Sequence, residues 1–145
     1  MIVDYLQLLR AEGMRSRYEI ATAVSNALKA IAVSLQVPLI AISQLSRENE
    51  KRQDKRPQLS DLRESGAIEQ DADVVMFVHC PEYYLRQEEP DPGSDDHDHW
   101  QVNLRRWAGK AEMIVAKHRH AATGKVTLRF DAPCSRFHDE QERGA

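Results

Sequence analysis

One long helical pattern lies between two apolar segments near the start of the sequence, and it limits the folds that the chain can adopt. Ser16 and Glu19 fit a capping box at the start of a helix. The apolar residues that follow recur at helical spacing: Ile20, Val24, Leu28, Ile31 and Leu35. Pro38 ends the helix, and the flanking runs Met1–Leu9 and Leu39–Ser43 are typical of strands. Strand, helix and strand with short connections predict an α/β fold with a parallel sheet and a right-handed crossover.

Further strands are predicted in the second half of the chain. Met1–Leu9 is nearly continuously apolar, which is typical of a strand buried on both faces, and Asp73–His79 has the same character. Three shorter strands follow near the end, the first two joined by a turn at Thr123–Gly124: Ala111–Ala116, Lys125–Asp131 and Ser135–His138.

The segments between these strands are polar. Leu45–Ser65 holds six basic and five acidic residues and is expected at the surface, and Ser60–Asp71 favours a short helix interrupted at Gly66. Pro81–Lys110 has no steady period and is predicted to be a mostly irregular loop or insertion. Within it, Gln87–His99 has six acids and no Lys or Arg.

Composition places the chain in a broad class. Its 145 residues, 41% hydrophobic, fit one soluble domain, and no apolar run approaches the roughly 18 residues that cross a bilayer. The start Met1–Asp4 lacks a basic segment, so no signal peptide is expected, and two cysteines make no disulfide framework. A reduced, cytoplasmic protein is expected. The net charge of -3 excludes a uniformly basic nucleic-acid binder, although the chain outside Gln87–His99 carries +3.

Two polar residues on the predicted parallel strands are candidates for nucleotide chemistry. Asp4 lies in an apolar run, where a carboxylate needs a partner such as a nucleotide-bound Mg²⁺; it could equally cap a loop. Gln44 ends the second strand, where it could contact a γ-phosphate or orient water, or else satisfy loop backbone. Ligands bind at this end of the strands in open α/β sheets.

Two further groups could contact phosphates. Lys117 and Arg119, two residues apart at a strand end, suit a phosphate clamp or arginine finger, or a solvated strand end. Arg63, Glu64 and Gly66 belong to a polar turn in which glycine would allow close approach to a phosphodiester; the alternative is a helix terminus with a glycine cap.

Several familiar motifs are missing from the sequence. Its six glycines never form G-x-x-x-x-G-K-[ST], and neither G-x-S-x-G, H-E-x-x-H nor G-x-G-x-x-G occurs. His97 and His99 lie among aspartates, but no pair has the spacing of zinc ligands. We therefore expect no metal bound by histidine or cysteine.

Taken together, several segments resemble the DnaB-type replicative helicases. The similarity covers residues 2–79 and 111–138, and its most specific part is the eleven-residue string Leu62–Ala72. The other similar segments are Ile2–Leu8, Val37–Arg47, Asp54–Asp73, Ala111–Arg119 and Thr123–Gly124.

The resemblance implies a partial RecA-like P-loop NTPase core: a mainly parallel sheet with flanking helices and a C-terminal β extension. Residues 1–145 would be the helicase C-terminal domain from the Walker B strand onward, truncated, with residues 81–110 as a variable acidic insertion. In the family, ATP hydrolysis with Mg²⁺ drives 5′–3′ unwinding of duplex DNA at the replication fork. The implied partners are single-stranded DNA, five further copies in a hexamer, a helicase loader and primase, with no membrane.

The resemblance also implies roles for the candidate residues. Asp4 would hold Mg²⁺ through water, and Gln44 would sense the γ-phosphate. Lys117 and Arg119 would act on the nucleotide of a neighbouring subunit. Arg63, Glu64 and Gly66 would touch the DNA backbone in the central channel.

The chain departs from the family pattern in two ways. The family's P-loop, catalytic glutamate and N-terminal collar all precede the strand of Asp4, so we expect this chain alone to be inactive. Ala121 and Ala122 replace the family's Gly-Pro after the arginine finger. Two other hypotheses are an interaction module that docks on an intact helicase ring, and a fragment of another RecA-like ATPase.

Overall fold

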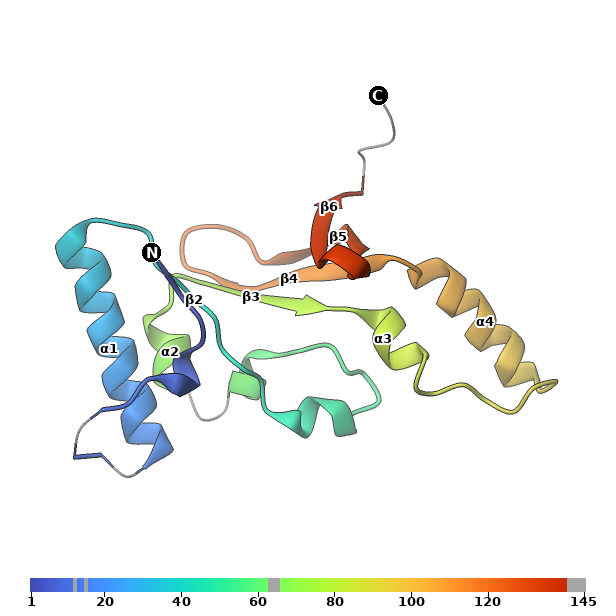
Figure 1. Cartoon of the computed structure of the whole chain (residues 1–145), viewed down its shortest axis with the longest axis horizontal. Helices are drawn as coiled ribbons and strands as arrows, with labels where there is room; N and C mark the ends of the chain where they lie inside the picture. The colour runs from blue at the N-terminus through green and yellow to red at the C-terminus, as the bar shows by residue number, and fades with distance from the viewer. Residues whose placement is uncertain (12, 15, 63–65, 141–145) are drawn as a thin grey trace. The chain divides into compact units, whose positions relative to one another are not determined.

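The computed structural model describes residues 1–11, 13–14, 16–62 and 66–140. The chain divides into two compact units, Met1–Val75 and Met76–Ala145, with the boundary inside one strand. Figure 1 shows the order of the elements along the chain, and each unit is considered by itself below.

Unit 1 contains the predicted strand–helix–strand arrangement. Strands β1 (Ile2–Val3) and β2 (Ile40–Ala41) are parallel, with Ile2 opposite Ile40, and helix α1 (Arg17–Leu35) connects them. The capping box is present, since the backbone N–H of Ser16 donates to Glu19 Oε2 at 3.4 Å. The parallel pairing and the helix are therefore confirmed.

The prediction of one long strand at Met1–Leu9 is wrong. After β1 the chain turns into a 3-10 helix, η1 (Leu6–Leu8), in which only Leu6 is buried. Leu8 keeps 62% of its surface exposed, so the apolar run does not lie inside a sheet. Continuous hydrophobicity cannot distinguish a strand from a short helical turn without a period.

The polar segment of unit 1 contains three short helices. These are the 3-10 helices η2 (Arg47–Lys51) and η3 (Leu59–Leu62) and helix α2 (Gly66–Asp71). Gly66 thus begins a helix where the sequence predicted an interruption. Helix α2 and the residues after it are fixed to α1, since Ser25 Oγ donates to Asp71 Oδ2 at 2.6 Å and Lys29 pairs with Asp73 at 2.7 Å.

The second sheet has the order β3–β4–β5–β6 and ends the chain as the predicted β extension. Strands β4 (Lys110–His118), β5 (Gly124–Asp131) and β6 (Arg136–Asp139) pair antiparallel. Phe130 and Phe137 stack across β5 and β6, with ring centroids 4.7 Å apart. With a parallel and an antiparallel sheet and flanking helices, the fold is mixed α/β, as predicted.

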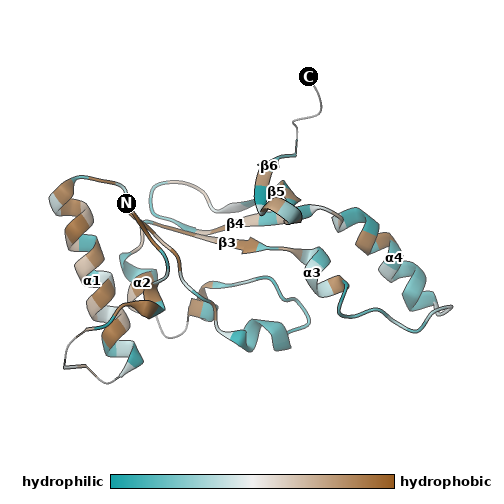
Figure 2. Ribbon diagram, viewed as in Figure 1, coloured by the Kyte–Doolittle hydropathy of each residue, from teal (hydrophilic) through white to brown (hydrophobic). Residues whose placement is uncertain are grey.

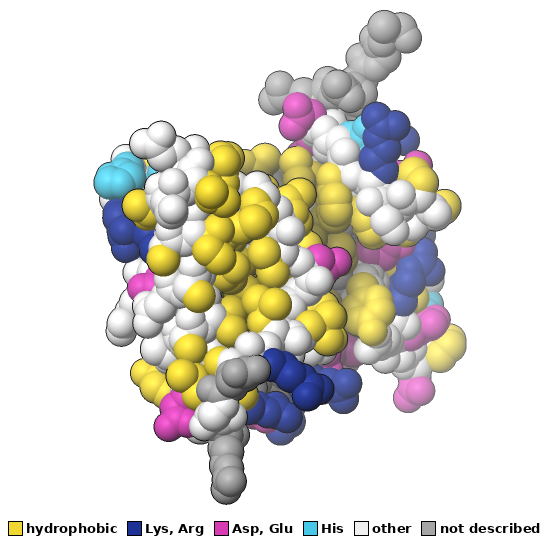
Figure 3. Space-filling model, turned by 60° about the vertical axis from the view of Figure 1, so that its left-hand side comes forward, with side chains coloured by type: hydrophobic (Ala, Val, Ile, Leu, Met, Phe, Trp, Pro, Cys, Tyr) yellow, Lys and Arg dark blue, Asp and Glu magenta, His cyan; other side chains and the backbone are white. Residues whose placement is uncertain are grey.

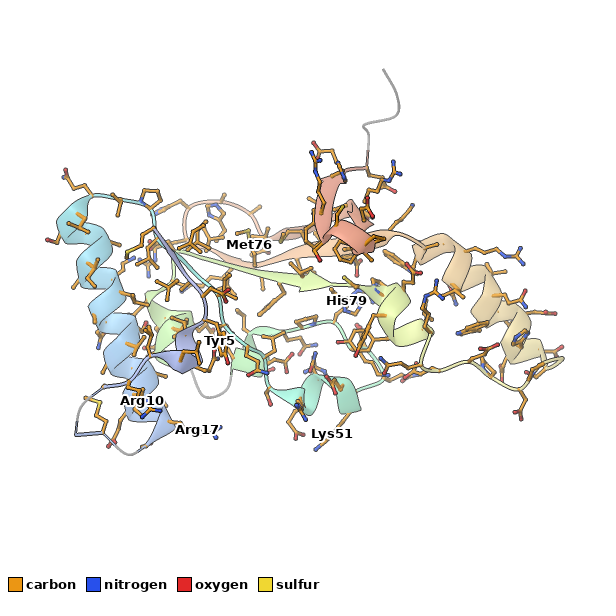
Figure 4. All side chains as sticks on the ribbon, viewed as in Figure 1. Tyr5, Arg10, Arg17, Lys51, Met76 and His79 are labelled. Atoms are coloured by element: carbon orange, nitrogen blue, oxygen red, sulfur yellow. The ribbon has the colours of Figure 1, made fainter. Side chains whose placement is uncertain are left out.

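Strand β3 (Val74–His79) forms where it was predicted but is buried on one face only. Val75, Phe77 and His79 are buried, while Met76 is 54% exposed. Figure 4 marks Met76 and His79 on this strand. The alternation follows from the period of two along a strand, so one face of β3 packs and the other remains open.

The prediction of an irregular loop at Pro81–Lys110 is wrong, because two helices form there. They are α3 (Pro81–Leu85) and α4 (Asp95–Trp107). Ser94 caps α4, accepting from the His97 amide at 3.2 Å, and the indole N–H of Trp100 donates to the Leu85 carbonyl at 2.7 Å. The acidic run supplies Asp95, Asp96 and Asp98 to the first turn, where negative charge stabilises the positive end of the helix dipole.

Large apolar side chains remain exposed on unit 1. Ile2 is 69% exposed and Val33 67%, and Figure 3 shows the resulting hydrophobic surface. Figure 2 shows that α1 is largely apolar, whereas α4 is mostly polar. Among the described residues, no helix is long and apolar enough to cross a membrane.

Candidate functional site

In unit 1 the carboxyl ends of β1 and β2 are joined by one side chain. The amide of Gln7 donates to Ser43 Oγ at 3.0 Å and to the Gln44 carbonyl at 3.2 Å, and its oxygen accepts from the Gln44 backbone N–H at 3.2 Å. The Gln7 side chain thus makes the hydrogen bonds to Gln44 that the backbone of a neighbouring strand would make, and it continues the pairing beyond β2. Sequence reasoning missed this residue, although a polar side chain inside an apolar run was a signal.

Asp4 lies immediately after β1 and is exposed. The expectation of a carboxylate buried in an apolar strand is therefore wrong, and Asp4 needs no partner to offset burial. Mg²⁺ at nucleotide sites keeps several waters and takes one or two carboxylates. An exposed carboxylate at the carboxyl end of a parallel strand fits that requirement, so Asp4 could hold such an ion through water.

The side chain of Gln44 is also exposed, two residues beyond the last hydrogen bond between the paired strand segments. In that last hydrogen bond, the Leu6 amide donates to the Ile42 carbonyl at 2.9 Å. Gln7 satisfies the backbone N–H and C=O of Gln44, which leaves the Gln44 side chain available at the surface. Parallel pairing thus brings the ends bearing Asp4 and Gln44 to the same edge.

The loop after Gln44 is closed by an ion pair that the sequence did not indicate. Arg52 Nη1 and Nη2 donate to the two carboxylate oxygens of Asp61, each at 2.8 Å, and the Asp61 side chain is 4% exposed. Burial by itself raises the pKa of the Asp61 carboxyl, but the hydrogen bonds from Arg52 and the Gln58 amide, with the Arg52 charge, hold that pKa below its ordinary value.

The Arg52–Asp61 ion pair makes the free energy of unfolding depend on pH. Because the Asp61 pKa is lower in the folded chain, its carboxylate stabilises the fold at pH values above the unfolded pKa, and this contribution is lost as pH falls through the folded pKa. We expect Asp61→Asn to lower the urea midpoint at neutral pH and the difference from the original chain to shrink below about pH 4. Asp139→Asn, at an exposed position in β6, is the control. A difference in urea midpoint between the two chains that stays constant with pH would contradict the lowered pKa of the folded Asp61 carboxyl.

The three predicted DNA contacts follow this loop in the sequence. Arg63 and Glu64 fall outside the described residues. Gly66 is half-buried, and a Cβ placed there would meet no atom of the described residues within 4 Å. Packing within unit 1 therefore does not require glycine at this position, and its role toward a phosphodiester stays a prediction.

The predicted basic pair belongs to unit 2. Lys117 lies in β4 and is half-buried, whereas Arg119 follows the last residue of β4 and is exposed. The next turn is fixed by His120, whose amide donates to His118 Nδ1 at 3.2 Å. The structure thus presents Arg119 at a strand end, as expected, while Lys117 remains part of the sheet.

Two histidines of this unit, His97 and His79, stack on aromatic side chains. His97 stacks on Trp100 with centroids 5.3 Å apart and approaches Glu89 at 3.5 Å, and buried His79 stacks on Tyr84 at 5.4 Å. Across the residues that the structure describes, there is no group of three His, Cys, Asp or Glu side chains that could hold a metal ion.

Comparisons with known proteins agree with one another. A family model described as the DnaB-like helicase C terminal domain matches residues 1–139. The replicative DNA helicase DnaB of Rickettsia prowazekii (strain Madrid E) is 46% identical over 144 residues, which are 99% of this chain and 30% of that protein. The same helicase of Haemophilus influenzae is 43% identical, over 99% of this chain and 27% of its own length.

Two solved structures have the same fold. One is described as an ATPase domain; it has a TM-score of 0.78 and 40% identity, over 97% of this chain and 44% of that one. The other, a DnaB-like replicative helicase described with its interactions with primase, has the same TM-score and identity over 30% of its chain. The chain thus spans about 30% of the length of the curated relatives.

Proposed function

Because the chain belongs to the DnaB-like helicase C-terminal domain family, we propose that it is part of a replicative helicase that couples ATP hydrolysis to 5′–3′ unwinding of DNA. The observation that carries this proposal is the parallel pairing of β1 and β2, continued by Gln7, which brings the ends bearing Asp4 and Gln44 to one edge. The activity is that of the longer protein, to which this chain contributes residues.

At that edge, two exposed side chains take different roles. The carboxylate of Asp4 would hold a nucleotide-bound Mg²⁺ through water, and such an ion would supply positive charge beside the phosphates. The Gln44 amide contacts the γ-phosphate of ATP. Its backbone is held by Gln7, so only its side chain needs to move when the phosphate leaves.

The remaining contacts involve other molecules. Arg119, exposed after β4, and Lys117 act on the nucleotide of the adjacent subunit in a ring of six. Arg63, Glu64 and Gly66 contact the phosphate backbone of single-stranded DNA in the channel. The solved relative described with primase supports primase as a partner in the cytoplasm, and the family suggests a helicase loader.

The proposal is tested by supplying the part of the ATPase domain that precedes this segment in the relatives. We define the completed domain as this chain fused behind that part of the Rickettsia prowazekii helicase. The completed domain should hydrolyse ATP with Mg²⁺, whereas the 145-residue chain alone should not. Asp4→Asn should lower the rate about 100-fold, as expected for a group acting on a metal through water.

The matched control is Asp91→Asn, which removes an exposed carboxylate in the other unit and should leave the rate unchanged. Hydrolysis by the chain alone would contradict the expected inactivity of the isolated chain, and full activity of the Asp4→Asn completed domain would show that Asp4 does not act at a nucleotide site.

A further inference from the structure

Arg119 lies in the connection between β4 and β5, beyond the point where these two strands stop pairing. Val115 opposite Gly124 is the last pair of their ladder, and residues 119–123 follow the end of β4 (Figure 1). The sequence has no proline in this connection, so no ring fixes the backbone angle φ there. Other contacts therefore set the conformation of the backbone at Arg119.

One side chain closes the backbone around Arg119. His118 Nδ1 accepts a hydrogen bond from the His120 backbone N–H at 3.2 Å, so the backbone of Arg119 lies inside the ring that this bond closes. Asn and Asp side chains fix turns in the same way, by bonding to the backbone two residues on. His118 is half-buried at the end of β4, whereas Arg119 and His120 are exposed. The bond thus ties the exposed turn to the sheet.

The bond to His118 requires a neutral ring. In neutral imidazole one nitrogen carries a proton and the other accepts, so acceptance at Nδ1 places the proton on Nε2. In imidazolium both nitrogens are donors, and Nδ1 can no longer accept from the His120 amide. Histidine is the side chain that ordinarily changes charge between about pH 5 and 8. Protonation of His118 in that range would break the bond.

Other ionisable side chains flank His118 on β4, in the turn and at the start of β5; they are Lys117, Arg119, His120 and Lys125. Lys125 approaches Glu112 of β4 at 3.7 Å. On β3, the other neighbour of β4 in the sheet, the ionisable side chain is His79, which stacks on Tyr84. Lysine and arginine keep their charge from pH 5 to 8, so the titration of His118 must be separated from that of the other histidines.

We propose that His118 is a positioning residue for ATP hydrolysis: its neutral ring holds the His120 amide and thereby fixes the backbone from which Arg119 reaches the nucleotide of the adjacent subunit. A small misplacement of a catalytic group lowers the rate of the chemical step. Hydrolysis therefore slows as His118 gains a proton. This inference rests on the proposed function, which assigns that role to Arg119.

The test compares three replacements in the completed domain. In His118→Asn, Oδ1 stands as many bonds from the backbone as Nδ1 did and accepts without titrating. His118→Leu keeps a side chain of similar size but has no acceptor. The matched control is His120→Asn, which removes the other histidine of the turn and keeps the backbone N–H. The measured quantities are kcat and KM for ATP between about pH 5.5 and 8.5.

We expect kcat of the original completed domain, divided by kcat of His118→Asn, to fall about tenfold from pH 8.5 to 5.5, while KM changes little. Groups that titrate in both proteins cancel in this ratio. His118→Leu should be about tenfold slower than the original at high pH and equal to it at low pH, and His120→Asn should follow the original. A ratio that stays constant with pH, or full kcat of His118→Leu at high pH, excludes the positioning role.

A second measurement does not depend on hydrolysis. In the 145-residue chain carrying His120→Asn, the amide proton at position 120 is followed by nuclear magnetic resonance. Its resonance should move upfield as pH falls, because the hydrogen bond to His118 is lost, and it should stay in place when His118→Asn is added. Equal movement in the two chains would show that protonation of His118 does not control the bond, and would exclude the proposal.

Arg119→Ala separates this inference from the proposed function. Loss of activity in Arg119→Ala together with the pH-dependent ratio supports both. If the completed domain does not hydrolyse ATP, or Arg119→Ala hydrolyses it at the full rate, the proposed role of Arg119 fails, and the positioning role fails with it. If Arg119→Ala loses activity while His118→Leu keeps it, the role of Arg119 stands and that of His118 is excluded.

Discussion

Replacing Arg119 by alanine is expected to lower ATP hydrolysis by the completed domain about 10³-fold, while nucleotide binding changes little. The reason is that an arginine finger stabilises the negative charge that develops on the transferred phosphoryl group in the transition state. It contributes little to binding of the ground-state nucleotide. Arg119 is exposed beyond the end of β4, as a group acting on another subunit must be. The measurement is steady-state phosphate release with a parallel nucleotide-binding titration.

Mixing two inactive variants tests whether Arg119 acts between subunits. Under the proposal, Asp4 of one subunit and Arg119 of the adjacent subunit act on the same nucleotide, so each variant removes one of the two residues from that site. Mixed rings therefore contain some sites with both residues intact, and partial activity should return. Arg129→Ala, which removes an exposed arginine from β5, is the control and should keep full activity. Absence of any recovery in verified mixed rings would contradict action between subunits.

Replacing Phe77 by alanine is expected to lower the free energy of unfolding of the chain by about 3–5 kcal/mol, since a buried phenyl ring is lost and a cavity remains. Phe77 is 5% exposed on the packed face of β3. Urea denaturation at 25 °C followed by circular dichroism measures the change. Phe77→Leu, with a smaller loss of volume, keeps the comparison possible if the alanine variant does not fold.

The matched control is Met76→Ala on the same strand. Met76 is 54% exposed, so its truncation should cost less than about 1 kcal/mol. Equal losses at the two positions would contradict the one-sided burial of β3. The comparison therefore tests which face of the strand packs, independently of any catalytic role.

Regular patterns in the sequence predicted much of the secondary structure. The stripe from Ile20 to Leu35 and its Ser16–Glu19 capping box identify α1, because helical period and capping are local properties. Strand β3 and the three strands β4, β5 and β6 were predicted for similar reasons, and the structure shows that the last three pair antiparallel. The parallel pairing of β1 with β2 was predicted from the short connections between these strands and the helix.

Two segments were predicted wrongly because their local signals were ambiguous. Met1–Leu9 has no period that distinguishes a strand from a turn, so only tertiary contacts decide that β1 ends at Val3. In Pro81–Lys110 the acidic residues suggested a solvated loop. Their position after the Ser94 cap instead makes them stabilise the first turn of α4.

The candidate site was predicted in part. Asp4, Gln44 and Arg119 are exposed at strand ends, but the predicted burial of Asp4 is absent and the catalytic assignments stay predictions. Gln7 and the Arg52–Asp61 pair were not foreseen, since each joins residues that no local pattern links. Arg52 and Asp61 are nine positions apart across a turn, and many other charged pairs in that loop were equally plausible from sequence.

The sequence by itself determined the family, the long helix and the strand segments, because motifs and periodicity are properties of neighbouring residues. The tertiary structure decided which charges pair, which face of β3 is packed and where β1 ends. Those outcomes depend on the burial of groups distant in the chain. The carboxylate of Asp61 is the clearest case: the polar segment around it was expected at the surface, but the Arg52 guanidinium allows it to be buried.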